Sequence, residues 1–468
     1  MMQEPANYVA HATARSRSSL SPSTSPGDPM TEIAVDDDGL RERPPTTTLA
    51  ADDRLRPYHW AVMVLGVLGY ATIAADAAIF PTSYPLVQQS LGFSDSAVGY
   101  IYAGGFFTCG VIAMFLIGPL TDRFGRKPLF VAAIAICSVF TILTGFAWNT
   151  MSFGILRSIA TIGYVSWGLA TVLIAESVPA KHRGWMTGTV PVGWAIGFGS
   201  SAFFSEHIAA SMGWRAVFWI VGILPLAFGI AVSFVIKETP HFQDLQHARR
   251  TGASRFHIDV AKTEKSVLSQ LWAADMRRRT IGVTLFFLFI VPQYAIMSYF
   301  GLSFLQGKDI SFLEANRAIT WANWLGIVTI LAASFVTRGK GAHYTLTAVG
   351  VLGSVCALFM VYLATPSTIV PWFIVYVLIT IGLWGGSSNF LQEAFPTRIR
   401  GTGGAWGSGM LWTSYGTLAL IVAPLLTIYS WNVLVIVFGA VLPLIALVGL
   451  WLVPQPKALN SNLEDLVH

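Results

Sequence analysis

Two ionisable residues lie inside long apolar segments of the chain, where a charge is costly. Asp76 occurs in YATIAADAAIF and Arg157 in GILRSIA, and neither stretch contains a second charged residue. A charged side chain in the middle of a bilayer costs at least a few kcal/mol, so such residues usually have a function. A carboxyl group beside a basic group can gain and lose a proton as its surroundings change. We therefore predict that Asp76 binds and releases a proton and that Arg157 is its partner. A purely structural ion pair is the alternative.

The segments that must position these two residues are long enough to cross a membrane. A bilayer core of roughly 30 Å needs about 20 apolar residues in a helix. At 1.5 Å per residue, Asp76 lies roughly 27 Å along the first apolar run and Arg157 about 9 Å along the fourth. Both are then expected in the outer half, where they could pair. Twelve such runs occur, near 58–80, 97–120, 128–148, 151–175, 185–207, 214–236, 281–305, 316–337, 344–364, 369–392, 404–427 and 431–453.

The composition is that of a protein with many membrane-spanning helices. Hydrophobic residues make up 54% of the chain and charged residues 11%, and the mean hydropathy is +0.60. A soluble protein of 468 residues would need far more charge to cover its surface. The net charge of +5 does not point to nucleic acid, because the basic residues lie between the apolar runs. The expected partners are therefore the lipid bilayer, protons and a small-molecule substrate, and the chain is expected to be a monomer.

The placement of Lys and Arg predicts the orientation in the membrane. Of the 29 such residues, only Arg215, Lys308 and Arg317 fall in loops expected outside. This asymmetry predicts that both termini lie on the cytoplasmic side of the cell's inner or plasma membrane. Either Met1 or Met30 could be the start. The predicted organisation is a disordered cytoplasmic tail (1–56), a six-helix bundle (57–236), a cytoplasmic central loop (237–280), a second six-helix bundle (281–454) and a cytoplasmic tail (455–468).

A dense charge cluster, GPLTDRFGRK, separates the second and third apolar runs. Further acidic and basic residues are expected on the same face, and opposite charges from the two halves could form bridges that hold this side closed. A solvated basic fringe is the alternative, but it would not require the acidic residues. The predicted cytoplasmic gate comprises Gly118, Asp122, Arg123, Gly125, Arg126, Lys127, Glu176, Arg183, Glu238, Glu393 and Arg400.

An internal repeat relates the two halves. ESVPAKHRG follows the fourth run and EAFPTRIRG follows the tenth, so that Glu176 and Glu393 occupy equivalent positions. Two copies of this spacing at corresponding places indicate a duplication. The same register aligns GPLTDRFGRK with FVTRGKGAHY, in which the acidic residue has been lost, and aligns Asp76 with Gln293.

These motifs resemble those of the major facilitator superfamily over nearly all of residues 57–460. Asp76 and Arg157 are similar to an aspartate in helix 1 and an arginine in helix 4 of sugar porters and of aromatic-acid, sialate and related metabolite symporters. The segment QEAFPTRIRGTG resembles the sequence that follows their helix 10. The resemblance implies an all-α membrane fold of twelve transmembrane helices in two pseudo-symmetric bundles, with alternating access and proton symport.

Differences from the motifs of sugar porters, aromatic-acid symporters and drug exporters narrow the range of expected substrates. Sugar porters carry a paired Gln in helix 7, whereas this chain has only Gln293 there. Sugar porters also carry Gly-Pro after the tryptophan of helix 10, whereas Gly385 and Gly386 follow Trp384 in this chain. Aromatic-acid symporters usually carry two acidic residues in helix 1, and Ile73 takes the place of the first. The Gly-Pro of drug exporters is absent from the fifth run. An organic acid, aliphatic or aromatic, is therefore predicted, with a sugar or polyol second and proton-driven export third.

Polar and aromatic residues in the second half are the candidate substrate contacts. Such groups suit a small solute with an apolar or ring-like body. Pro292 is expected to break the seventh helix beside Gln293. Because the chain has 16 Trp, most of its aromatic residues must instead belong to interfacial belts or to packing. The candidates are Gln293, Tyr294, Tyr299, Trp384, Asn389 and Trp412.

The sequence predicts neither an enzyme nor a cofactor. It has no phosphate-binding P-loop, which argues against an ATP-driven pump. No cluster of His and Cys is arranged to hold a metal, and the three Cys all fall in apolar runs, where thiols pack as small hydrophobes. A channel would not need Asp76 and a two-sided gate, and a membrane enzyme would need a reactive cluster. The prediction is a proton-coupled secondary transporter.

Overall fold

The computed structural model describes residues 54–239, 242–243, 247, 268–396 and 399–455. The predicted tails therefore lie almost entirely outside the described residues, as does most of the predicted central loop. Every regular element within these ranges is a helix. The N-terminal set comprises α1 (Pro57–Leu91), α2 (Asp95–Val111), η1 (Ile112–Leu116), α3 (Ile117–Phe124), α4 (Arg126–Thr144), α5 (Thr150–Ala160), η2 (Thr161–Val165), α6 (Ser166–Ser177), α7 (Ala180–Gly188), α8 (Val192–Phe204), η3 (Ser205–Ala209), α9 (Ala210–Met212) and α10 (Trp214–Val235).

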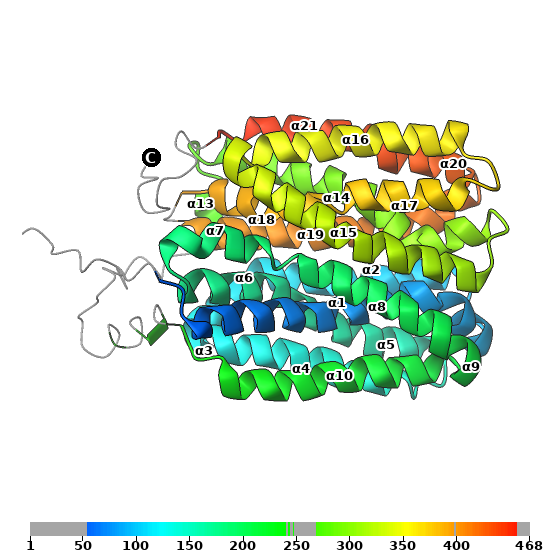
Figure 1. Ribbon diagram of the computed structural model, residues 1–468, viewed down its shortest axis with the longest axis horizontal. Helices are drawn as coiled ribbons and strands as arrows, with labels where there is room; N and C mark the ends of the chain where they lie inside the picture. The colour runs from blue at the N-terminus through cyan, green and yellow to red at the C-terminus, as the bar shows by residue number, and fades with distance from the viewer. Residues whose placement is uncertain (1–53, 240–241, 244–246, 248–267, 397–398, 456–468) are drawn as a thin grey trace, which may run out of the picture. The chain divides into compact units, whose positions relative to one another are not determined.

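The C-terminal set packs beside the N-terminal set, and the two appear as separate layers in Figure 1. The main contacts between them run along α2 with α19 and along α8 with α15. The set comprises α13 (Leu268–Leu271), α14 (Arg277–Gln306), α15 (Phe312–Lys340), α16 (Ala342–Leu363), α17 (Ile369–Thr380), α18 (Leu383–Glu393), α19 (Arg400–Leu426), α20 (Trp431–Leu434), η5 (Val435–Val441) and α21 (Leu442–Leu452).

Eleven helical segments in the described part of the chain are long and apolar enough to cross a membrane. The remaining predicted span, the fifth, near 185–207, is divided into α7, α8, η3 and α9, of which α8 and η3 pack against α1. The fold is therefore the predicted twelve-helix membrane fold. Gly197 lets α8 approach α1 closely, because a Cβ at this position would lie only 2.0 Å from the carbonyl oxygen of Ala71.

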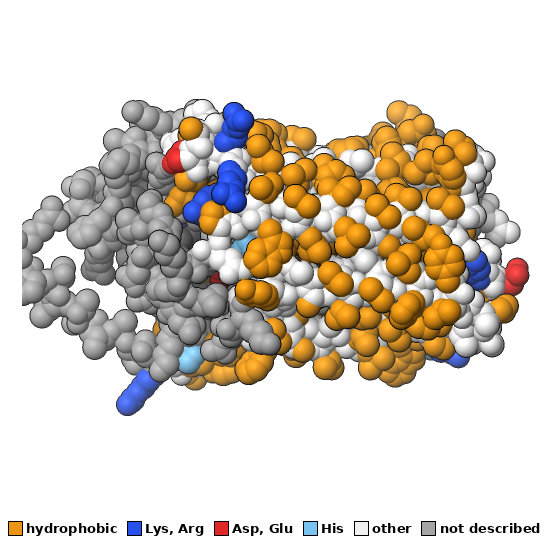
Figure 2. Space-filling model, turned by 90° about the horizontal axis from the view of Figure 1, so that it is seen from above, with side chains coloured by type: hydrophobic (Ala, Val, Ile, Leu, Met, Phe, Trp, Pro, Cys, Tyr) orange, Lys and Arg blue, Asp and Glu red, His pale blue; other side chains and the backbone are white. Residues whose placement is uncertain are grey.

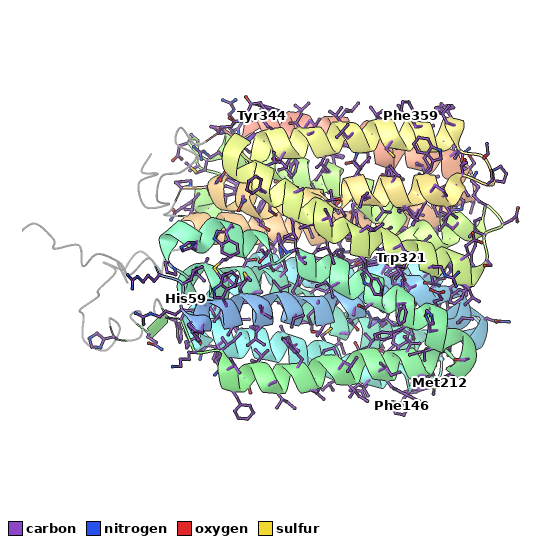
Figure 3. All side chains as sticks on the ribbon, viewed as in Figure 1. His59, Phe146, Met212, Trp321, Tyr344 and Phe359 are labelled. Carbon is purple, nitrogen blue, oxygen red and sulfur yellow. The ribbon has the colours of Figure 1, made fainter. Side chains whose placement is uncertain are left out.

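The surface between the two ends of the helices is apolar. Figure 2 shows hydrophobic side chains over this band, with Lys and Arg at the ends. Phe146, Trp321, Tyr344 and Phe359 point outward from the helices (Figure 3), and each is exposed. Exposed aromatic and aliphatic side chains of this extent are stable only against an apolar solvent such as lipid.

Two proline-containing helices differ from the sequence prediction. α1 continues through Pro81 and Pro85 to Leu91, so Asp76 lies in the middle third of the helix and not near its outer end. α14 also runs unbroken through Pro292. Proline leaves the carbonyl four residues earlier without its helical partner, and here the Ser414 hydroxyl of α19 donates to the carbonyl oxygen of Leu288 at 2.7 Å. A neighbouring helix therefore supplies the missing hydrogen bond.

Two helices, α4 and α16, begin directly after a glycine with a positive φ. Gly125 precedes α4 with φ 97° and ψ 166°, and Gly341 precedes α16 with φ 85° and ψ 159°. Positive φ favours glycine, which lacks a Cβ. The same sharp turn thus precedes α4 and α16, although Gly341 lies one residue before the position that the repeat register aligns with Gly125, and Gly213 makes a similar turn before α10.

Glycines of α2 let the two sets approach closely along α19. A Cβ at Gly99 would lie 2.6 Å from the carbonyl oxygen of Ala419, and one at Gly110 would lie 3.2 Å from that of Gly409. Small residues let the backbones of two membrane helices approach without intervening side chains. This contact fixes the aromatic residues of α2 against those of α19.

Candidate functional site

Asp76 and Arg157 form a buried, two-pronged ion pair. Nη1 of Arg157 donates to Oδ1 of Asp76 at 2.7 Å, and Nη2 donates to Oδ2 at 3.1 Å and to the backbone oxygen of Asp76 at 3.0 Å. The residues are 1% and 4% exposed. The structure thus brings together the two residues that the sequence singles out. A buried pair of this kind is stable only when further hydrogen bonds satisfy its remaining atoms.

Tyr164 and Thr141 supply those further hydrogen bonds. The Tyr164 hydroxyl donates to Oδ2 of Asp76 at 2.9 Å and accepts from Nη2 of Arg157 at 3.0 Å. The Thr141 hydroxyl also donates to Oδ1 of Asp76. Asp76 therefore has partners from α4, α5 and η2. Neither hydroxyl residue could be singled out from the sequence, because neither is unusual inside an apolar helix.

A small cavity of about 10 Å³ lies beside this ion pair. That volume is close to the minimum for one water molecule. Arg157 and Tyr164 line it on one side, and Tyr102 and Phe106 of α2 line it on another. The cavity connects the ion pair with the aromatic residues at the boundary between the two sets.

An aromatic cluster occupies this boundary, with Phe106 at its centre. The ring of Phe106 lies 5.9 Å from that of Trp412, nearly parallel at 12°, and 5.1 Å from that of Tyr299. It also lies 6.0 Å from Tyr102 and 5.3 Å from Tyr415. Since α2 belongs to one set and α14 and α19 to the other, these rings meet across the boundary.

Hydrogen bonds next to this cluster also cross between the sets. The indole Nε1 of Trp194 in α8 donates to the Tyr294 hydroxyl in α14 at 2.8 Å. That hydroxyl in turn donates to Oδ1 of Asn323 in α15 at 3.2 Å. Neither Trp194 nor Asn323 was predicted as a site residue, since an isolated aromatic or amide residue gives no sequence signal.

The predicted substrate residues divide into two groups. Tyr294, Tyr299, Trp384 and Trp412 are buried in or beside the aromatic cluster. Gln293 instead donates to the carbonyl oxygens of Gly350 and Gly439, inside the C-terminal set. The internal repeat aligns Gln293 with Asp76 in sequence. In the structure, however, the Gln293 side chain joins α14 to α16 and η5. Asn389 is half-buried on α18.

The charged residues at the end that carries α3 and α4 pair within the N-terminal set. Arg126 contacts Glu176, with Nε 3.2 Å from Oε2 and Nη2 3.3 Å from Oε1. Glu238 accepts from the backbone N–H groups of Arg126 at 3.1 Å and of Lys127 at 3.2 Å, which caps the start of α4. The prediction from the sequence was of bridges between the two halves. The ion pair described at this end, between Arg126 and Glu176, joins α4 to α6 within one half.

The rest of the predicted gate is only partly visible. Arg123 is exposed, with its guanidinium over the ring of Phe124. Glu393 is half-buried, and burial raises its pKa to about 7. Among the described residues, a hydrogen bond from the Ser334 hydroxyl to the carbonyl oxygen of Gly188 at 3.0 Å joins the two sets at this end. The side chains of Asp122, Arg183 and Arg400, and the surroundings of Gly118, lie outside what the structure describes.

At the opposite end an ion pair joins the two sets. Nη2 and Nε of Arg317 in α15 lie 2.8 and 2.9 Å from Oε1 of Glu206 in η3. Glu206 is buried and Arg317 is exposed. The hydroxyl of Ser303 also donates to that of Tyr84 at 2.8 Å, from α14 to α1. From the sequence, Arg317 is recognisable only as an external charge, because the π-helical turn that points Glu206 toward it has no clear signature.

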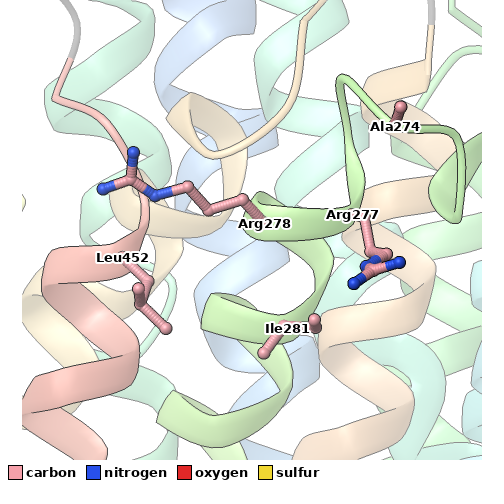
Figure 4. A pocket seen from close by; sticks show the side chains of 5 residues that line it. All are labelled: Ala274, Arg277, Arg278, Ile281 and Leu452. Carbon is pink, nitrogen blue, oxygen red and sulfur yellow. The ribbon is translucent and has the colours of Figure 1, made fainter.

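A wider groove lies on the surface at the α4 end, but its charged side chains do not point toward a common centre. It encloses about 390 Å³ and is lined by Ala274, Arg277, Arg278, Ile281 and Leu452. Figure 4 shows the guanidinium groups of Arg277 and Arg278 pointing to opposite sides of α14. They do not gather around one point as the groups around Asp76 do.

Together these features define a multi-pass integral membrane protein with a charged site buried between its helices. The family model described as Major Facilitator Superfamily matches residues 66–419. The chain therefore belongs to the Major Facilitator Superfamily, and it is a transporter and not an enzyme, in line with its relatives.

Curated relatives of similar length are bacterial transporters of organic acids. The chain is 26% identical to the "Cis,cis-muconate transport protein" of Acinetobacter baylyi, over 76% of this chain and 86% of that protein. It is 24% identical to the "Gallate transporter" of Pseudomonas putida, over 77% and 84% respectively. The solved structure of the proton:xylose symporter XylE matches with a TM-score of 0.67 at 18% identity, over 88% of this chain and 99% of that one. That likeness shows the fold.

Proposed function

We propose that this chain carries a planar organic acid, aromatic or conjugated, into the cell together with a proton. Coupling of substrate transport to the proton is supported by the ion pair of Asp76 and Arg157, which is buried beside the boundary between the two helix sets. The acid substrate is supported by the relatives that transport muconate and gallate. A transporter that couples the two fluxes must make the binding of each depend on the other.

Charge balance at the buried site provides that dependence. When Asp76 takes up a proton, Arg157 is left as a buried cation without its counter-charge, which is unfavourable. A substrate carboxylate that enters the neighbouring aromatic cluster supplies a negative charge close to Arg157, across the small cavity that Tyr102 and Phe106 share with it. Proton and acid therefore stabilise each other's binding, and neither is favoured alone.

Alternating access requires contacts that hold each end closed in turn. At the end with Glu206 and Arg317, the ion pair and the hydrogen bond from Ser303 to Tyr84 join the two sets. At the α4 end, Ser334 contacts Gly188. We assign the α4 end to the cytoplasmic side of an inner or plasma membrane, because this end carries the basic residues. The charged loop there would act by bracing the N-terminal set through Arg126 and Glu176.

The test is uptake into proteoliposomes with an imposed inside-alkaline gradient. The panel contains cis,cis-muconate, gallate, benzoate, xylose and the cation tetraphenylphosphonium. Accumulation of one of the acids that collapses when a protonophore is added is the expected result. Accumulation of xylose alone would favour the sugar symporter. Movement of the cation alone, against its own gradient and in exchange for protons, would favour an exporter. Either of these two outcomes would overturn the proposal.

A further inference from the structure

Three tyrosine hydroxyls in the aromatic cluster are buried without a hydrogen-bond partner among the described residues. They belong to Tyr102 on α2, Tyr299 on α14 and Tyr415 on α19, and these residues are 7%, 3% and 2% exposed. Buried hydroxyl groups almost always have a partner, and each exception needs an explanation. Tyr164 and Tyr294, which lie next to the same cluster, both have their hydroxyls bonded.

The rings of the three tyrosines pack around the ring of Phe106. The ring of Tyr299 lies 5.7 Å from that of Tyr102 and 5.1 Å from that of Tyr415. All three contact Phe106, whose ring faces Trp412 across the boundary between the sets. The unpartnered donors therefore come from both sets and lie on residues that contact Phe106, and Tyr415 also contacts Trp412.

Arg157 is not available as the direct ligand of a carboxylate in this structure. Its Nη1 and Nη2 donate to Asp76, and Nη2 also donates to Tyr164. Arg157 can therefore act on a carboxylate only as a nearby charge, through the cavity that it shares with Tyr102 and Phe106.

We propose that the hydroxyls of Tyr102, Tyr299 and Tyr415 bind the carboxylate of the substrate and that Phe106 and Trp412 bind its planar body. The inference rests on the proposed uptake of an organic acid and assigns the residues that recognise it. Neutral O–H donors form short, strong hydrogen bonds to a carboxylate. Parallel rings favour a planar ligand over a puckered one such as a sugar. The slot between the rings is closed here, and separation of α2 from α19 would open it.

The experiment compares binding of each acid in the uptake panel with binding of its carboxamide to purified protein in detergent. The amide has the same planar body but lacks the negative charge. Replacing any of the three tyrosines by Phe keeps the ring and removes the hydroxyl. We expect each of Tyr102→Phe, Tyr299→Phe and Tyr415→Phe to weaken binding of the acid about tenfold and binding of the amide less than twofold.

Tyr362→Phe is the matched control, because Tyr362 is 72% exposed on α16 and distant from the cluster. It should change neither affinity. If the three variants bind the acid as tightly as the wild type, or lose acid and amide equally, the assignment of these hydroxyls is wrong even though the transporter still carries acids. If the wild type binds none of the panel acids, the proposed function itself fails. Thermal unfolding of each variant identifies a loss of binding that comes from misfolding.

Discussion

The Tyr164 hydroxyl bridges the two members of the buried ion pair, since it donates to Oδ2 of Asp76 and accepts from Nη2 of Arg157. It can do so because η2 continues directly from α5, which carries Arg157, and so both residues lie on the same face toward α1. Asp76 is thus held by a network and not by a single contact. Loss of one member should affect the others, because such networks are cooperative.

Asp76→Asn should abolish gradient-driven accumulation while exchange of substrate across the membrane continues. The amide cannot take up a proton, so binding of the acid no longer depends on one. The variant also leaves Arg157 buried without a counter-charge, and a loss of about 3–5 kcal/mol in stability is expected. Uptake with and without a gradient, together with thermal unfolding, measures both effects.

Asp309→Asn is the matched control for this substitution. Asp309 is exposed and has a φ of 63°, a conformation that asparagine adopts easily. This variant should accumulate the acid as the wild type does. Undiminished accumulation by Asp76→Asn would show that the proton is carried elsewhere.

Breaking the ion pair of Glu206 and Arg317 should favour the state that is open at their end. Glu206→Gln or Arg317→Gln removes a charge-assisted contact between the two sets, worth about 1–3 kcal/mol because one partner is buried. The rate at which an external thiol reagent modifies a cysteine placed at Phe106 reports this opening and should rise several-fold in either variant. The exchanged pair Glu206→Arg with Arg317→Glu should restore a slow rate. Equal labelling in all four proteins would mean that the contact does not control access.

Glu393 should make stability depend on pH near neutrality. Burial raises its pKa in the folded protein to about 7, whereas the unfolded chain has an ordinary carboxyl pKa. The contribution of protonated Glu393 to the stability of the folded protein is therefore complete at low pH, and it is lost as the pH rises through about 7. Between pH 6 and pH 8 the wild type should lose about 1.4 kcal/mol.

Glu393→Gln should remove this part of the pH dependence and be the more stable protein at pH 8. Glu314→Gln is the control, because Glu314 is exposed near the start of α15. Thermal unfolding across the pH range measures all three proteins. Parallel curves for the wild type and Glu393→Gln would contradict the assignment of the titration to Glu393.

Gly125→Ala should destabilise the charged loop before α4 for two reasons. Its φ of 97° is unfavourable for alanine, and the added Cβ would lie 2.3 Å from Oε2 of Glu238, the carboxylate that caps α4. Gly213→Ala separates the two causes, since Gly213 has a φ of 82° but no atom within 4 Å of an added Cβ. We expect about 1–2 kcal/mol of backbone strain in both variants, with a further loss at Gly125. Equal losses would mean that Glu238 moves aside at little cost.

The sequence by itself determined the helices and the buried pair. A membrane span needs about 20 apolar residues, so the spans can be counted along the chain, and most predicted ranges end within a few residues of the observed helices. Asp76 and Arg157 could be singled out because a charge inside such a span is rare and needs a partner. Both signals depend on local composition, which does not require knowledge of how the helices pack.

Only the tertiary structure decided which polar groups meet. Arg126 could face an acid of either half, and the packing of α4 against α6 places it on Glu176. Gln293 aligns with Asp76 in the repeat, yet the rotation of α14 turns it into the C-terminal set and turns Tyr299 toward the boundary. Helix rotation and crossing depend on the summed packing of many apolar side chains and close glycine contacts. No single residue type or spacing along the chain encodes that sum.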